Sequence, residues 1–321
     1  MVEMLYRQLG KSGPKVSIIG YGASPLGNEF GAVDPKEGER AVHYAIERGI
    51  NYFDVAPYYG RTLAETRLGQ ALRGRRDQVI LATKMGRYDV HQFDFSAERV
   101  MQSVEESLLR LQTDYIDVFQ VHDIEYGRQK QILDETLPAM VRLKEAGKVG
   151  LVGITGYPVG MLSQVAEMAG VDTVLSYCRY NLMDRTMDDA LTPVARRHGI
   201  GLINASPLHM RVLTERSVPA WHPAPKRVLA VGQKVADYCR SQGIDIADLA
   251  IQFALQHPYV ATTLVGMSKV RHVDRNLRSV GVVPDPELLA AVLKMIEPVA
   301  NICWKEGRPE NDDPGAVEKH S

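Results

Sequence analysis

The chain alternates short apolar, β-prone segments with helical segments along almost all of its 321 residues. Such alternation is typical of βα units, in which a helix returns the chain to the next strand of a parallel sheet. Barrel strands are expected at 18–22, 51–54, 79–83, 116–121, 151–154, 173–176, 201–205 and 262–265. A short hairpin over 6–17 should precede them. We therefore predict an α/β fold, a (β/α)8 TIM barrel with an N-terminal β-hairpin.

One barrel domain should cover residues 1–305. Residues 306–321 are polar and rich in Asp, Glu, Gly and Pro, so we expect a mobile C-terminal tail without a catalytic role. Residues 206–225 form a long loop after the seventh strand, where a barrel would place substrate contacts.

The composition limits the possible partners and compartments. The formal net charge is -1, which gives no electrostatic reason to expect a nucleic acid or a membrane as partner. Cys178, Cys239 and Cys303 are odd in number and widely spaced, which favours a reducing compartment over a disulfide framework. No metal-ligand spacing stands out. With no signal-peptide pattern at the start, we expect a cytoplasmic protein, a monomer or a small homo-oligomer, that acts on a small molecule.

Four residues follow successive predicted strands and form one chemical group: Asp54, Tyr59, Lys84 and His122. The carboxyl ends of barrel strands form the rim where chemistry takes place. A tyrosine has a free pKa of about 10, and a lysine ammonium beside it would favour the phenolate. Aspartate would hold that lysine charged, and histidine would orient the reacting oxygen. Each residue alone has an ordinary structural interpretation, but the ordered set predicts an acid–base site.

This set resembles the Asp, Tyr, Lys and His tetrad of the aldo-keto reductase family. Acid–base groups cannot accept a hydride, so redox chemistry requires a nicotinamide, and a Rossmann GxGxxG motif is absent from the sequence. A phosphate site is instead expected where the last strand meets the following helix. By the resemblance, cofactor contacts are expected at Gly22, Ala23, Ser24, Ser176, Tyr177, Ser206, Leu208, Gly266, Ser268, His272 and Asn276.

The resemblance also suggests NAD as the cofactor. Members that prefer the phosphorylated cofactor usually carry a lysine at the position of Gly266 and an arginine at that of His272. Lys269, Arg271 and Arg275 remain nearby and could supply the missing charge. Thr155-Gly156 and Ala205 also depart from the family pattern around the nicotinamide, which leaves the details of ring binding open.

Several further stretches, including Pro57-Tyr58-Tyr59-Gly60 and His122-Asp123-Ile124-Glu125, resemble the plant-type L-galactose 1-dehydrogenase branch of the family. The implied reaction is NAD-dependent oxidation of an aldose, L-galactose or a related sugar such as L-fucose, at C1 to the aldonolactone, with Tyr59 as the base. Substrate contacts are expected at Tyr58, Arg87, Tyr88, Asp123 and Trp221, although each also has a plausible packing role.

Two other functions remain open at this stage. A broad NADPH-dependent aldehyde or ketone reductase would use the same tetrad, and a cofactor-binding subunit that serves a partner would use the same barrel. The complete tetrad argues against the subunit, and Gly266 with His272 argues against the NADPH reductase.

Overall fold

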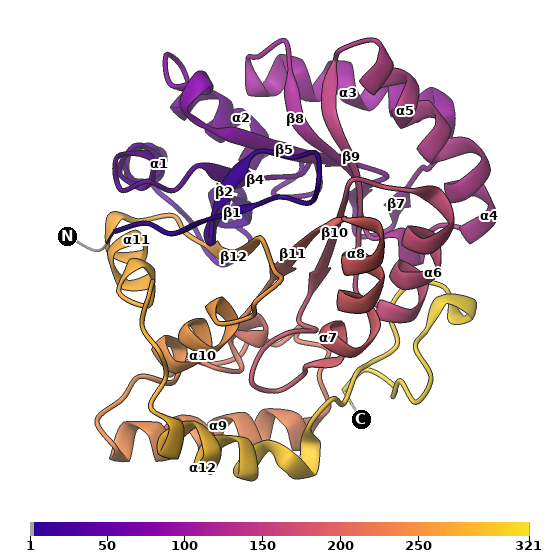
Figure 1. Cartoon of the computed structure of the whole chain (residues 1–321). Helices are drawn as coiled ribbons and strands as arrows, with labels where there is room; N and C mark the ends of the chain where they lie inside the picture. The colour runs from indigo at the N-terminus through magenta and orange to yellow at the C-terminus, as the bar shows by residue number, and fades with distance from the viewer. Residues whose placement is uncertain (1–2, 321) are drawn as a thin grey trace.

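The computed structural model describes residues 3–320. Eight parallel strands form a closed barrel in which the last strand pairs with the first, so the predicted (β/α)8 barrel is confirmed (Figure 1). The barrel strands are β3 (Ile19–Gly22), β4 (Tyr52–Asp54), β5 (Ile80–Met85), β8 (Ile116–Val121), β9 (Val149–Gly156), β10 (Thr173–Tyr177), β11 (Gly201–Ala205) and β12 (Thr262–Gly266).

The helices surround this barrel (Figure 1). The longer ones are α1 (Pro35–Glu47), α2 (Leu63–Ala71), α3 (Ala97–Leu111), α5 (Leu137–Glu145), α6 (Val159–Ala169), α8 (Thr192–His198), α9 (Lys226–Ser241), α10 (Ile246–Leu255), α11 (Val270–Leu277) and α12 (Pro286–Ile296). Shorter elements are the antiparallel pair β6 (Arg87–Asp89) and β7 (Gln92–Phe93), with α4 (Gln129–Gln131) and α7 (Thr186–Ala190). Within residues 3–320, a helix long and apolar enough to span a membrane is not found.

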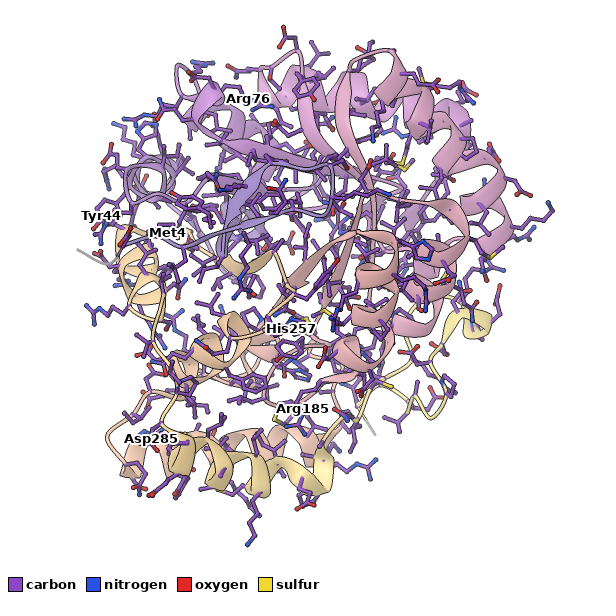
Figure 2. The ribbon with its side chains drawn as sticks, viewed as in Figure 1. Met4, Tyr44, Arg76, Arg185, His257 and Asp285 are labelled. Carbon is purple, nitrogen blue, oxygen red and sulfur yellow. The ribbon has the colours of Figure 1, made fainter. Side chains whose placement is uncertain are left out.

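Helices α1 and α11 meet because β3 and β12 are paired. Tyr44 of α1 donates a hydrogen bond to Asp274 of α11 at 2.6 Å, and Arg48 donates to the Tyr44 hydroxyl at 2.5 Å. Figure 2 shows Tyr44 at this junction, at the outer edge of the molecule. Side-chain hydrogen bonds thus join the ring of helices at the same place where backbone hydrogen bonds between β12 and β3 close the barrel.

The predicted hairpin, β1 (Tyr6–Gln8) and β2 (Lys15–Ser17), closes the amino-terminal end of the barrel. Leu9 lies in the apolar interior with 1% exposure, and the amide of Lys11 donates to the carbonyl of Gly199 just before β11. A Cβ at Gly10 would approach the Gly201 nitrogen to 2.6 Å, and Gly10 also has a positive φ of 65°. Glycine therefore lets the hairpin lie against the strand starts, so the carboxyl end stays available for a site.

The last residues pack against the barrel, although the sequence predicts a mobile tail over 306–321. Trp304 is buried and stacks on Tyr157 with ring centroids 4.5 Å apart. Asp313 accepts hydrogen bonds from the amides of Val159 and Gly160 at the start of α6, at 3.1 and 2.8 Å. The composition of the tail therefore gave no indication of these specific contacts. The mobility of the tail in solution stays a prediction.

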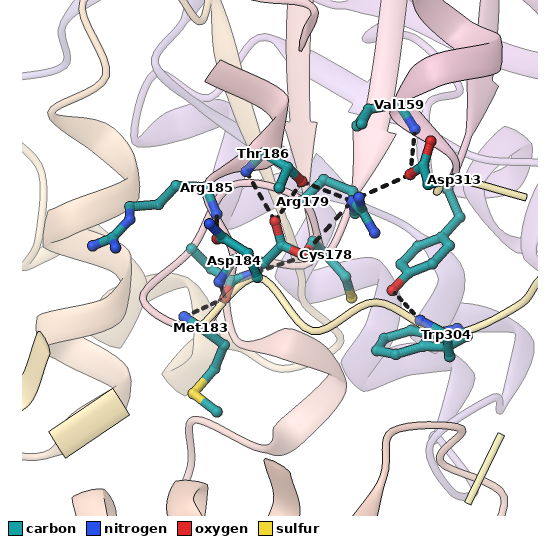
Figure 3. Close-up of polar contacts among 12 residues, drawn as sticks. Val159, Cys178, Arg179, Met183, Asp184, Arg185, Thr186, Trp304 and Asp313 are labelled. Atoms are coloured by element: carbon teal, nitrogen blue, oxygen red, sulfur yellow. Dashed lines mark hydrogen bonds and ion pairs between the residues drawn. The ribbon is translucent and has the colours of Figure 1, made fainter. Parts of the chain in front are cut away.

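The strongest of these anchors is an ion pair between Asp313 and Arg179. The Arg179 guanidinium, only 2% exposed, lies 2.8 Å from Asp313 and 3.7 Å from Asp184. Figure 3 shows Arg179 between these two carboxylates, with Thr186 beside them. Because a buried guanidinium is costly without counter-charges, the tail contributes to the stability of the loop after β10.

Replacing Asp313 by Ala should therefore destabilise the protein. Removing one partner of a buried ion pair costs about 3–5 kcal/mol, and we expect the lower end because Asp184 remains beside Arg179. Urea unfolding measures the change. The exposed pair of Lys305 and Glu318 provides a control, since Glu318→Ala should cost about 0–1 kcal/mol. Equal effects of the two substitutions would contradict the anchoring role.

Candidate functional site

A cavity of about 1060 Å³ opens at the carboxyl ends of the barrel strands. Its walls come from the ends of all eight strands, the loops that follow them and the C-terminal tail. The four residues predicted to be catalytic, Asp54, Tyr59, Lys84 and His122, all line it. The structure therefore brings the predicted tetrad together in one cavity.

Lys84 connects the members of this tetrad. Its ammonium donates to the Asp54 carboxylate at 2.5 Å and to the carbonyl of Val55 at 2.8 Å, and it lies 3.4 Å from the Tyr59 hydroxyl. Lys84 and Asp54 are 1% and 3% exposed. The ammonium therefore has fixed partners that hold it beside the phenol.

Gln120 belongs to the same group, although the sequence analysis missed it. Its side-chain amide donates to the second carboxylate oxygen of Asp54 at 3.2 Å. Gln120 pairs with Lys84 across β5 and β8, and it lies two residues before His122 on the same face of the strand. The signal that could have identified it was a polar residue on the strand face otherwise formed by Ile116 and Val118.

His122 lies against the rings of Tyr58 and Tyr59. Its ring meets that of Tyr59 edge-on, with centroids 5.5 Å apart and an interplanar angle of 85°. Burial lowers the pKa of His122 well below its usual value, and Lys84 and Arg87 lower it further. The histidine is therefore neutral near pH 7 and can donate from one ring nitrogen.

The environment of Tyr59 differs from the one expected from the sequence. Burial raises the pKa of Tyr59 well above 10, and the charges of Asp54 and Asp123 add to this effect. The ammonium of Lys84 is already neutralised by Asp54 at 2.5 Å, so its influence on the phenol is small. The protein alone thus holds Tyr59 as a neutral phenol.

Charged and aromatic side chains form the wall next to the tetrad. Arg87 donates to Asp123 at 2.6 Å and lies over the ring of Tyr58, 4.0 Å from its centroid. Trp221 reaches the cavity from the loop after β11 and is 52% exposed. Tyr88 lies outside the lining, where its hydroxyl accepts from the amide of Gly86. Four of the five predicted substrate residues therefore reach the cavity.

The predicted cofactor residues divide in a similar way. Those that line the cavity are Gly22, Ser24, Tyr177, Ser206, Leu208, Gly266, Ser268, His272 and Asn276. Ala23 and Ser176 are fully buried and do not reach it. The lining positions run from the tetrad to α11, so the cavity can hold an elongated molecule.

Helix α11 and the residue before it are rich in positive charge. Lys269, Arg271 and Arg275 line the cavity here together with Arg216. Burial lowers the pKa of His272 to about 4, and the neighbouring cations contribute. His272 is therefore uncharged near pH 7.

Carboxylates partly neutralise these cations. Arg275 lies 2.7 Å from Asp245 and 3.2 Å from Asp248. Lys269 lies 3.5 Å from Glu37. Only part of the positive charge is therefore available to an anionic group.

Further lining residues were not found from the sequence. Phe30 faces Trp221 with ring centroids 6.2 Å apart, and Glu306 and Lys319 enter the cavity wall from the tail. Lys319 lies 3.0 Å from Glu306, which also accepts from Tyr126. Their position depends on long-range packing of the tail, for which the sequence carries no local signal.

The chain is similar to several known proteins. The profile of the Aldo/keto reductase family matches residues 18–297. The chain is 43% identical to L-galactose dehydrogenase of Arabidopsis thaliana over 97% of this chain and 100% of that protein. It is 33% identical to D-arabinose 1-dehydrogenase of Saccharomyces cerevisiae over 68% of each chain. The solved holo form of aldo-keto reductase AKR11C1 from Bacillus halodurans covers 97% of this chain and 100% of its own, with 28% identity and a TM-score of 0.77.

Replacing Lys84 by Met should make the stability depend on pH. Burial raises the pKa of Asp54, and Lys84 is the main opposing influence, so the variant's carboxyl should keep its proton to a higher pH. The unfolded chain releases that proton above about pH 4, so the variant's folded state loses stability as the pH rises from 4 to 8. We expect the Tm to fall further below wild type at pH 8 than at pH 5.

The double variant Lys84→Met with Asp54→Asn provides the control. It removes the charge that burial penalises, so it should recover part of the lost Tm at pH 8. An equal loss of Tm at both pH values in the single variant would show that Asp54 is not ionised in the wild-type pair.

Proposed function

The chain belongs to the Aldo/keto reductase family, and we propose that it oxidises an aldose at C1 to the aldonolactone with NAD. L-Galactose, or a related sugar such as L-fucose, is the proposed substrate, in line with the relatives named L-galactose dehydrogenase and D-arabinose 1-dehydrogenase. The observation that carries the proposal is the buried Asp54–Lys84 pair beside Tyr59 and His122, next to a wall of charged side chains. The free, buried cysteines are compatible with the cytoplasm, which we propose as its location.

The lining of the cavity fits a nicotinamide dinucleotide. Cationic side chains and the amides at the start of α11 suit its phosphates, and Asn276 in the last turn of α11 is polar and 5% exposed. We propose that Gly266, Ser268 and Asn276 hold the adenosine end, while Tyr177 and Ser206 lie toward the tetrad. When bound, the oxidised cofactor supplies a hydride acceptor and a positive ring charge.

The chain's own residues would handle the proton of the sugar. With its own proton released to solvent, the Tyr59 phenolate would accept the proton of the C1 hydroxyl as the hydride leaves C1, so that the C1–O bond becomes the lactone carbonyl. His122, neutral because of its burial, would donate a hydrogen bond to the same oxygen. Asp54 would hold Lys84 beside the phenol. The remaining sugar hydroxyls would meet Arg87 and Asp123, which offer donors and acceptors on one wall.

A screen of aldoses with NAD and NADP tests this function by following the absorbance of the reduced cofactor. We expect L-galactose or L-fucose with NAD to give the highest kcat/KM. Faster reduction of simple aldehydes with NADPH than oxidation of any sugar would favour the alternative, a broad carbonyl reductase.

Replacing Tyr59 by Phe should abolish turnover while NADH still binds. Loss of a general acid or base costs about 10²–10⁴-fold, and the phenyl ring keeps the packing against His122. Tyr58→Phe is the matched control. It removes a neighbouring hydroxyl that would contribute one hydrogen bond, so the expected loss is about tenfold or less. Similar losses of turnover in both variants would show that Tyr59 is not the general acid or base.

The same assignment determines the pH dependence of the wild type. Because burial raises the pKa of Tyr59, the phenolate becomes more populated throughout the alkaline range. The initial rate of sugar oxidation should therefore rise from pH 7 to about pH 10 without levelling. A rate independent of pH in that range, measured with product absent, would point to another base or to slow cofactor release.

NAD should be preferred over NADP because the neutral His272 and Gly266 offer no charge to a 2′-phosphate. Introducing Gly266→Lys and His272→Arg should narrow the preference, since a charge-assisted hydrogen bond contributes about 1.5–3 kcal/mol. A Cβ at 266 would lie 3.1 Å from Pro25, so this side chain must shift by a few tenths of an ångström. The ratio of kcat/KM for the two cofactors measures the change. A wild-type preference for NADP would show that Lys269 or Arg271 already binds the phosphate.

A further inference from the structure

Glu125 is a buried acid that the proposed chemistry does not use. It lies three residues after His122, in the short 3-10 turn Ile124–Tyr126, and its exposure is 0%. Among the described residues it has no ion-pair partner, whereas the other fully buried glutamate, Glu65, pairs with Arg110 at 2.6 Å. A carboxylate buried without a cation is costly, so such a group tends to keep its proton and to be hydrogen-bonded.

One oxygen of the Glu125 carboxyl holds two tyrosines. Oε1 accepts from the amide of Tyr157 at 3.1 Å and from the hydroxyl of Tyr177 at 3.3 Å. Tyr177 lines the cavity, and its ring lies 5.4 Å from that of Tyr157. The carboxyl therefore fixes the outer end of a ring that forms part of the cavity wall.

Gly156 makes this position of Glu125 possible. A Cβ at 156 would approach Oε2 of Glu125 to 2.5 Å, closer than side-chain atoms normally come. Any other residue at the end of β9 would therefore displace the carboxyl.

The tail holds the backbone of the same residue. The side chain of Asn311 donates to the carbonyl of Glu125 at 2.8 Å, and the amide of Arg308 donates to it at 2.9 Å. Glu125 thus connects the tail to Tyr177, and through it to the cavity.

We propose that Glu125 is a positioning residue that holds Tyr177 against the cofactor in the cavity. This inference rests on the proposed function, because it requires that the cavity binds a nicotinamide dinucleotide. Burial and the nearby Asp123 raise the pKa of Glu125 well above its usual value, which favours the protonated carboxyl. A protonated carboxyl needs no cation, and glutamine reproduces its shape and its acceptor oxygen.

Three variants test the proposal through the Kd of NADH, measured by fluorescence without sugar. Glu125→Met removes the acceptor, and Tyr177→Phe removes the donor from the same hydrogen bond. Each should weaken NADH binding by about two- to tenfold, the factor expected for one hydrogen bond. The double variant should be no worse than either single one, because both remove one interaction. Glu125→Gln should bind NADH within about twofold of wild type, since its oxygen can still accept.

Glu65→Gln is the control for a general effect of altering a buried acid. It should lower the Tm but leave the Kd of NADH unchanged. The proposal is overturned if Glu125→Met lowers the Tm without changing the Kd, if the two single effects add, or if Glu125→Gln is as weak as Glu125→Met. A wild-type protein that binds neither NADH nor NADPH would overturn the proposed function and this inference together. A wild-type protein that binds NADH, with variants that fail as described, would overturn this inference alone.

Discussion

The ion pair between Lys84 and Asp54 is the interaction on which the arrangement of the site depends. Both groups are almost completely buried, and moving two charges out of water costs several kcal/mol each. That cost is offset only because every partner is fixed: Lys84 also bonds to a backbone carbonyl after β4, and Asp54 also accepts from Gln120. A hydrophobic pair would stabilise a barrel of this kind as well or better. What the pair does for the site is geometric: it holds the Lys84 nitrogen 3.4 Å from the Tyr59 hydroxyl, to which it donates.

The closed sheet determines where such charges can lie. The interior of the barrel is filled by apolar side chains, and the hairpin covers its amino-terminal end. Polar groups that follow the strands therefore converge at the other end, where they can share partners and reach the cavity. Neutral His122, neutral Tyr59 and the raised pKa of Glu125 all result from the same burial. Desolvation is thus the main influence on the pKa values of these three side chains. A buried pair of opposite charges occurs beside them, between Lys84 and Asp54.

Much of this architecture could be predicted from the sequence. The strand positions followed from the apolar runs, within about two residues of their observed ends, and the tetrad followed from its place after those runs. The pKa of Tyr59 could not be predicted, because it depends on how deeply the phenol is buried and on how fully Asp54 neutralises Lys84. The packing of the tail could not be predicted either. Its anchor, Asp313, gains its role only from Arg179, which lies 134 positions earlier in the chain.

The central claim, that C1 of an aldose gives its hydride to a nicotinamide in this cavity, can be tested most directly by isotope transfer. L-Galactose deuterated only at C1 would be oxidised with NAD, and the reduced cofactor would be isolated and analysed by mass spectrometry. The account predicts one deuterium in the cofactor, a lactone product and a slower rate than with unlabelled sugar. A reduced cofactor without deuterium would contradict the account, because the hydride would then come from another carbon.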